Sequence, residues 1–145
     1  MRQIHDCNAM VVYAKDKAIF QTRALQEHWW YAIEVDSDLR STSQKPSQID
    51  YIYFHLRWEK ALVYRAKVKD IILCSDDPRL NTILNANAKD LKKCVIRFDE
   101  EAKRIEPIIA RTKGSKERIR DRRYIYHERV TATATYDSIF ITTKP

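Results

Sequence analysis

The sequence predicts an α+β fold, a small curved β-barrel or mostly antiparallel sheet with two or three flanking helices. About six to eight segments are rich in β-branched and aromatic residues, and two or three short segments have helical spacing. Strands and helices do not alternate regularly, and there is no internal repeat. The chain has 145 residues, which is enough for one core but too short for two. We therefore expect a single domain covering residues 1–145.

The chain opens with a predicted strand at Met10–Ala14 and a short helix. Asp16 stands where a residue that caps a helix is expected, because its side chain can accept a hydrogen bond from a free backbone N–H group of the first turn. Ala14, Ala18 and Leu25 share a rough helical face. These residues predict one short helix after the first strand.

Two of the three tryptophans are adjacent, in the predicted strand HWWYAIEV at residues 28–35. Neighbouring residues on a strand point to opposite faces, so Trp29 and Trp30 should lie on opposite sides of the sheet. The Trp29 face is apolar, whereas the Trp30 face also carries Glu34. We expect Trp29 in the core and Trp30 on a mixed face within reach of a ligand.

A polar surface loop at residues 37–48 is expected to lead into an antiparallel hairpin. Residues 51–58 and 61–69 both alternate between apolar and polar side chains, and only Glu59 and Lys60 separate them. One face of this hairpin should be core. The other face should carry the aromatic and basic residues Tyr51, Tyr53, His55, Arg57, Arg65, Lys67 and Lys69.

The second half of the chain adds one helix and several strands. Asp77-Pro78 predicts a helix start, because proline is favoured at the first helical position. Residues 94–98 form a predicted strand. Either residues 103–110 pair back onto that strand, or Asp99 caps a helical turn before Pro107. Further strands are expected within 124–143, where β-branched and aromatic residues dominate.

The charge is positive and uneven. The chain carries a net charge of +7, and the run RTKGSKERIRDRR at residues 111–123 contains seven basic and two acidic residues. A concentrated positive segment favours a polyanionic partner such as DNA or RNA. The only glycine, Gly114, excludes the glycine-rich loops that cradle nucleotide phosphates, and we expect no cofactor.

Metal and membrane functions find no support in the sequence. The three cysteines form no C-x-x-C pair, and the four histidines are scattered without the spacing of metal ligands, so we expect neither a metal site nor a disulfide. No apolar run approaches the length of about 18 residues that spans a bilayer, and the first residues lack the apolar stretch of a secretory signal. A cytoplasmic location without membrane contact is expected.

One short motif points to an enzyme. Glu101-Ala102-Lys103 fits the E-x-K half of a metal-dependent nuclease signature, in which carboxylates hold Mg²⁺ and the lysine orients water. Its flanks, Asp99-Glu100 and Arg104, are charged, whereas a catalytic strand usually has apolar neighbours. A small nuclease is therefore an alternative function.

The aromatic residues favour a binding module. A flipped or single-stranded base needs flat rings for stacking and a few polar groups for its edge. The predicted base-binding residues are Trp30, Tyr53, His55 and Trp58. The predicted phosphate-binding residues are Arg57, Arg65, Lys67, Lys69, Arg118, Arg120, Arg122 and Arg123. For any one aromatic residue, the alternative is a purely structural role in covering the sheet.

Residues 28–73 resemble the PUA-like superfamily, in particular its EVE and YTH-related branch. The matching features are Trp29-Trp30 on an early strand, the D-x-I-x-F pattern at Asp50–Phe54 and the A-x-V pattern at Ala66–Val68. The resemblance implies a small β-barrel that takes a modified nucleobase into an aromatic cage. Trp30 and Trp58 would be cage walls, and Tyr53 a third. The glycine usual before Asp50 is replaced by Ile49.

The sequence thus predicts a non-enzymatic nucleic-acid-binding module that reads a base, modified or not, while basic side chains hold the backbone. Some domains of this kind are the recognition modules of restriction systems. The 145 residues contain no nuclease or ATPase domain beside this module, and a partner protein that supplies enzymatic activity is one expected partner. A third reading is a protein-interaction domain whose exposed sheet face binds an acidic partner.

Overall fold

The computed structural model describes residues 7–33, 41, 47–78, 93–110, 124–131 and 139. The strands are β1 (Ala9–Ala14), β2 (Trp29–Ile33), β3 (Tyr51–Leu56), β4 (Ala61–Leu73), β5 (Cys94–Phe98), β6 (Lys103–Ala110) and β7 (Tyr124–Ile125). The helical segments are α1 (Lys17–Phe20), η2 (Gln21–Glu27), η4 (Cys74–Asp76) and η6 (His127–Arg129). This content confirms the predicted α+β class.

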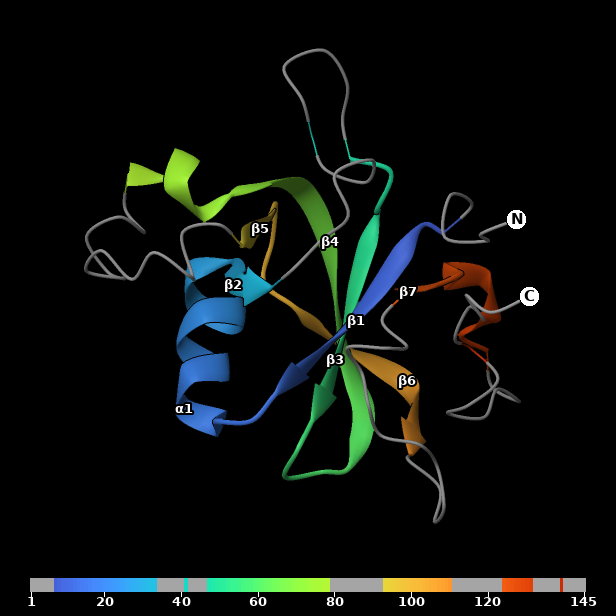
Figure 1. Ribbon diagram of the computed structural model, residues 1–145. Coiled ribbons are helices and arrows are strands. Elements are labelled where there is room, and N and C mark those ends of the chain that lie inside the picture. Colours follow the sequence, from blue (N-terminus) through green and yellow to red (C-terminus); the bar gives the residue numbers. More distant parts are fainter. Residues whose placement is uncertain are drawn as a thin grey trace.

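The described strands form one open sheet in the order β2-β5-β4-β3-β1-β7, with β6 paired to β4 (Figure 1). All the strand pairs are antiparallel except β1 with β3, whose parallel pairing matches Ala9 with Tyr51 and Ala14 with Leu56. The chain between these two parallel strands contains the helix and β2. The closed barrel allowed by the sequence is not formed by the strands that the structure describes.

β4 is the longest strand and joins the two halves of the sheet. Its first half pairs with β6, and its second half pairs with β5. Shifts of register occur between Leu62 and Tyr64 and between Val68 and Asp70, and such irregularities bend a strand and increase its twist. The predicted hairpin with β3 is confirmed, because Tyr51 pairs with Lys67 and Tyr53 with Arg65.

The predicted helix start is confirmed. The Asp16 side chain accepts a hydrogen bond from the backbone N–H of Ile19 at 3.0 Å. After Phe20, however, the helix continues in the wider π form as far as Glu27. π-Helices are rare and frequently occur at functional sites. None of the helices in the described ranges has the length and apolar character needed to cross a membrane.

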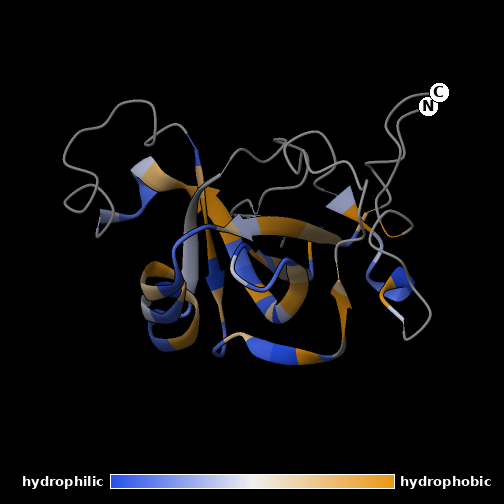
Figure 2. Cartoon of the chain, turned by 90° about the horizontal axis from the view of Figure 1, so that it is seen from below, coloured by the Kyte–Doolittle hydropathy of each residue, from blue (hydrophilic) through white to orange (hydrophobic). Residues whose placement is uncertain are grey.

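Both faces of the central sheet are covered by apolar side chains. The core on the helix side contains Phe20, Trp30 and Phe54, together with residues of β1, β4 and β5. A second cluster on the opposite face contains Val11, Tyr53, Leu62, Ile109, Ile125 and Ile139. Figure 2 shows hydrophobic residues concentrated along the crossing strands. Alternation along β3 therefore sends its even-numbered residues to one core and its odd-numbered residues to the other.

Some expected elements differ from those observed. Residues 103–110 are extended, as one of the two alternatives predicted, but they pair with β4 and not with the 94–98 strand. Residues 124–130 form only the two-residue strand β7 followed by the turn η6. Residues 79–92 of the expected helix, and 132–138 and 140–145 of the expected final strands, lie outside the described ranges.

His28 ends the helical segment with φ of 65° and ψ of 46°, the left-handed conformation that usually belongs to glycine. We expect His28→Gly to raise the free energy of unfolding by about 0.5–1 kcal/mol, because it removes the clash of Cβ with the backbone. Urea unfolding measures this change. Thr22→Gly, at an exposed helical position, is the matched control and should lower stability by a similar amount. A loss of stability in His28→Gly would contradict this reading.

Candidate nucleic-acid interface

The adjacent tryptophans are both buried, so the expected division between a core face and a mixed face is wrong. Trp30 is 8% exposed and packs in the helix-side core, with its ring centroid 6.2 Å from that of Phe20 and 5.4 Å from that of Phe54. Trp29 is 2% exposed and packs with Cys74 and Val95, while its Nε1 donates to Glu27. Phe20 of the helix covers the Trp30 side of β2, which the alternation of residues 28–35 left open.

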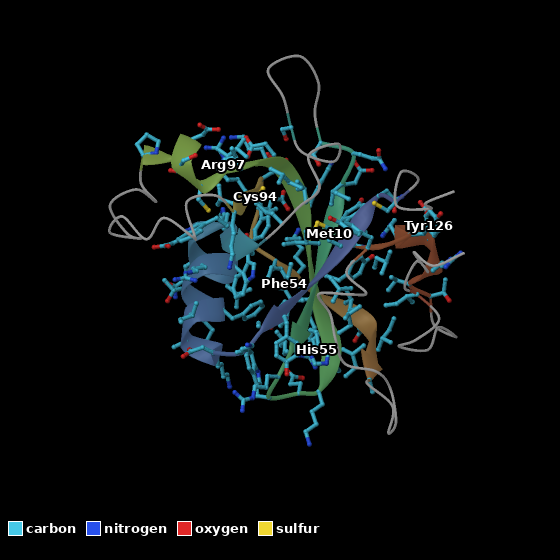
Figure 3. The ribbon with its side chains drawn as sticks, viewed as in Figure 1. Met10, Phe54, His55, Cys94, Arg97 and Tyr126 are labelled. Atoms are coloured by element: carbon cyan, nitrogen blue, oxygen red, sulfur yellow. The ribbon has the colours of Figure 1, made fainter. Side chains whose placement is uncertain are left out.

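The four predicted base-binding residues do not line one pocket. Trp30 and Trp58 lie on the helix side of the sheet, whereas Tyr53 belongs to the cluster on the opposite face. His55 follows Phe54 on β3 (Figure 3), is fully buried, and stacks on Tyr13 with a centroid distance of 4.8 Å. Of the four, Trp58 alone is half-exposed.

Trp58 borders an open pocket of about 430 Å³ between the helix and the β3–β4 turn. Its lining residues are Lys17, Phe20, Gln21, Leu25, Leu56, Trp58, Glu59 and Tyr64. Phe20 packs against both half-exposed rings, with centroid distances of 5.9 Å to Trp58 and 5.1 Å to Tyr64. This volume falls within the range of small-molecule sites. We call it the Trp58 pocket.

A different group of aromatic and basic residues gathers on the face opposite the helix. Arg65, Lys67 and Lys69 are exposed and alternate along β4 with Ala66 and Val68, which pack into the helix-side core. The cross-strand pairs Tyr51–Lys67 and Tyr53–Arg65 bring rings beside cations. We call Tyr51, Arg65, Lys67, Lys69 and His127 the basic face.

Tyr51 is the centre of the basic face. Its half-buried ring stacks on His127, with centroids 4.3 Å apart and planes 24° apart. The Arg65 guanidinium carbon lies 4.9 Å from the centroid of the same ring. A guanidinium and an imidazole that share one aromatic ring make a flat, basic surface suited to stacking.

Tyr53 and His127 are joined by a hydrogen bond of 2.6 Å between the phenol oxygen and Nδ1. Burial raises the pKa of the Tyr53 phenol, and a hydrogen bond from Arg65 partly offsets that rise. Burial also lowers the pKa of His127, and the positive charge of Arg65 lowers it further. Tyr53 is thus a neutral phenol at pH 7, and His127 is mainly neutral.

Asn8 holds His127 in place. The backbone N–H of His127 donates to Asn8 Oδ1 at 2.7 Å, and Asn8 Nδ2 donates to Glu128 at 2.7 Å. The carbonyl oxygen of Asn8 accepts from the backbone N–H of Asp50 at 2.7 Å. Asn8 therefore connects the starts of β1 and β3 with η6, which follows β7 on the side of the molecule remote from α1 (Figure 1).

The remaining predicted phosphate contacts divide into two groups. Arg57 is exposed in the β3–β4 turn, at the end of β3 remote from Tyr51. Arg118, Arg120, Arg122 and Arg123 lie outside the described ranges. In the sequence, their run follows β6 directly and ends at Arg123, directly before β7 and four positions before His127.

The nuclease motif gains no support from the described part of the chain. Lys103 forms an exposed ion pair with Glu100 at 3.0 Å. In that part of the chain no three His, Cys, Asp or Glu side chains are grouped so that they could hold a metal ion.

Sequence reasoning missed His127 as a site residue. It belongs to four scattered histidines, and its partner Tyr53 is 74 residues away, so no local spacing announces the pair. No protein-family model, curated protein or solved structure matches the chain, and the site rests on its own geometry.

Proposed function

We propose that the chain is a nucleic-acid-binding module that holds a single strand on the basic face. The observation that carries this proposal is the half-buried Tyr51 ring among exposed cations of β4, with Tyr51 beside Lys67 and Arg65 over the Tyr51 ring. A strand of nucleic acid presents bases and phosphates in alternation. Rings stack on bases without regard to sequence, and cations contact phosphates.

The basic run at residues 111–123 supports the same partner. It is covalently attached to β7, next to the basic face, and supplies seven further cations. A protein partner with an acidic surface would also be attracted by this charge.

A base pocket is a second part of the proposal, and the Trp58 pocket is the place favoured for it. Two half-exposed rings over a buried Phe20 form walls and floor, and Gln21 offers an amide that can donate to and accept from a base edge. Of the predicted cage residues, Trp58 is retained. Phe20 and Tyr64 take the places that the sequence assigned to Trp30 and Tyr53. The proposal also includes a PUA-like fold for the chain and a preference of this pocket for modified bases.

The test is a titration of fluorescently labelled single- and double-stranded oligonucleotides, with and without methylated bases. We expect single strands to bind, and Tyr51→Ala to weaken binding by about 1–3 kcal/mol, roughly 5-fold to 150-fold, because it removes the ring against which Arg65 and His127 pack. Tyr51→Phe retains the ring and is the matched control, with affinity close to that of the unmodified protein.

Trp58→Ala in the same titration separates the two parts of the proposal. A selective loss of affinity for one base, methylated or not, assigns that base to the Trp58 pocket. If Trp58→Ala weakens all binding and Tyr51→Ala changes none, the basic face is the wrong surface. If no oligonucleotide binds, the whole proposal is wrong.

A further inference from the structure

Tyr53 and His127 form a hydrogen-bonded pair whose direction can be worked out from chemistry. Tyr53 is buried, and among the described residues the geometric hydrogen-bond partner of its phenol is His127. The phenol hydrogen is therefore best satisfied by His127 Nδ1, 2.6 Å away. A neutral imidazole that accepts at Nδ1 carries its hydrogen on Nε2. The pair therefore fixes one tautomer of His127, with an N–H group at Nε2.

His127 is also fixed in orientation. Its backbone is bonded to Asn8, its ring is stacked on Tyr51, and its Nδ1 is occupied by Tyr53. Among the residues that the structure describes, no hydrogen-bond partner of Nε2 is found. A half-exposed imidazole held by three contacts, with one donor left over, is pre-organised to bind an acceptor.

Arg65 has the largest effect among the charged groups around His127. Arg65 is exposed, and within the described ranges it forms no ion pair with a carboxylate. The other charged groups that act on His127 are Glu128, on its own turn, and Asp50, at the start of β3. Glu128 accepts a hydrogen bond from Asn8. Arg65 thus supplies a positive charge close to the imidazole, and among the described residues it contacts Tyr51 and Tyr53.

We infer that Arg65 and His127 form a phosphate-binding site, in which the guanidinium and the Nε2–H group donate to oxygens of one phosphate and Tyr53 orients the imidazole. Arg65 supplies the charge-assisted hydrogen bonds typical of phosphate recognition. Tyr53 is buried, so it is a positioning residue. The inference rests on the proposed function for the source of the phosphate, which is either an internal diester or a terminal monoester.

Binding of the anion should be coupled to a proton. A phosphate beside His127 favours the imidazolium form and so opposes the effects of burial and of Arg65. Inorganic sulfate is a useful probe because it remains a dianion through the neutral range, so that any change of affinity with pH reports on the protein. We expect sulfate to bind more tightly as the pH falls from about 8 towards the reference histidine pKa of about 6.5.

The experiment is nitrogen-15 NMR of the histidine side chains during titration with inorganic phosphate and sulfate. His127 should be in the Nε2–H form without ligand, and either anion should raise its measured pKa. Arg65→Met should weaken phosphate binding about tenfold or more. His127→Phe keeps a ring on Tyr51 and should also weaken it. Tyr53→Phe should mix the two tautomers, whereas Tyr13→Phe, its matched control, should leave them unchanged.

The source of the phosphate is assigned by competition. A 5′-phosphorylated oligonucleotide that displaces phosphate better than its 5′-hydroxyl counterpart assigns the site to a terminal phosphate, and equal displacement assigns it to the backbone. If oligonucleotides bind but His127 does not respond and Arg65→Met has no effect, the phosphate site is wrong and the proposed function stands. If phosphate binds and no oligonucleotide does, the site stands and the proposed function is wrong.

Discussion

Trp30→Ala is expected to lower the free energy of unfolding by about 3–5 kcal/mol, the typical cost of truncating a buried tryptophan. Trp30 is 8% exposed, and its ring packs edge to face against Phe54 and Phe20. The alanine variant leaves a cavity beneath the helix that these two rings border. Because the loss is a large share of the stability of a domain this size, the variant should be near its unfolding threshold.

Urea unfolding of three variants tests this expectation. Trp30→Phe keeps an aromatic ring and is the matched control, with a loss well below that of alanine. Trp58→Ala removes a half-exposed ring and should also lower the free energy of unfolding by less than Trp30→Ala, because it removes less buried apolar surface. If Trp30→Ala lowers the free energy of unfolding by less than about 1 kcal/mol, the indole is not part of the core. Trp30 would then again be a candidate ligand-binding residue.

The two tryptophans illustrate what alternation along a strand can and cannot predict. The sequence correctly indicated that Trp29 and Trp30 point to opposite sides of β2, because that follows from backbone geometry alone. It could not indicate what covers each side, since this depends on where the helix and β5 pack. Glu34, two residues past Ala32, made the Trp30 side look mixed, although Trp30 itself lies under Phe20.

Local signals predicted local structure well. Asp16 caps the helix as expected, and the alternation around Glu59 and Lys60 gave the correct hairpin. The partner of β6 was not predictable in the same way, because β4 is long enough to pair with different strands along its length. The change from α to π geometry after Phe20 also has no signal in the helical spacing of residues 17–27.

The candidate site shows the same division. The basic row of Arg65, Lys67 and Lys69 could be predicted, because alternation placed it on the face opposite Ala66 and Val68, and the structure has it there. His127 could not, because it reaches Tyr51 and Tyr53 only through the pairing of β7 with β1 and the contact with Asn8. Contacts between residues so distant in sequence are set by the fold as a whole.

Replacing Arg65, Lys67 and Lys69 together by Met is expected to reduce the salt dependence of single-strand binding. Each phosphate contact with a single strand releases about 0.7 counterions, so the loss of three contacts should make the plot of log affinity against log salt shallower by about two units. Methionine keeps apolar side-chain bulk on β4 and removes the charge. These side chains are exposed, so unfolding free energies should change little.

The control is a variant that loses the same net charge on another part of the surface. Lys15, Lys17 and Lys60 are exposed on the helix side and in the β3–β4 turn, and their triple replacement by Met changes the net charge equally. A general electrostatic attraction would respond to both triple variants alike, because steering depends on total charge. Direct phosphate contact on the basic face would flatten the salt dependence in the first variant only. If the control variant flattens the salt dependence more than the first variant does, the single-stranded nucleic acid lies along the Trp58 pocket. The basic face is then not the binding surface.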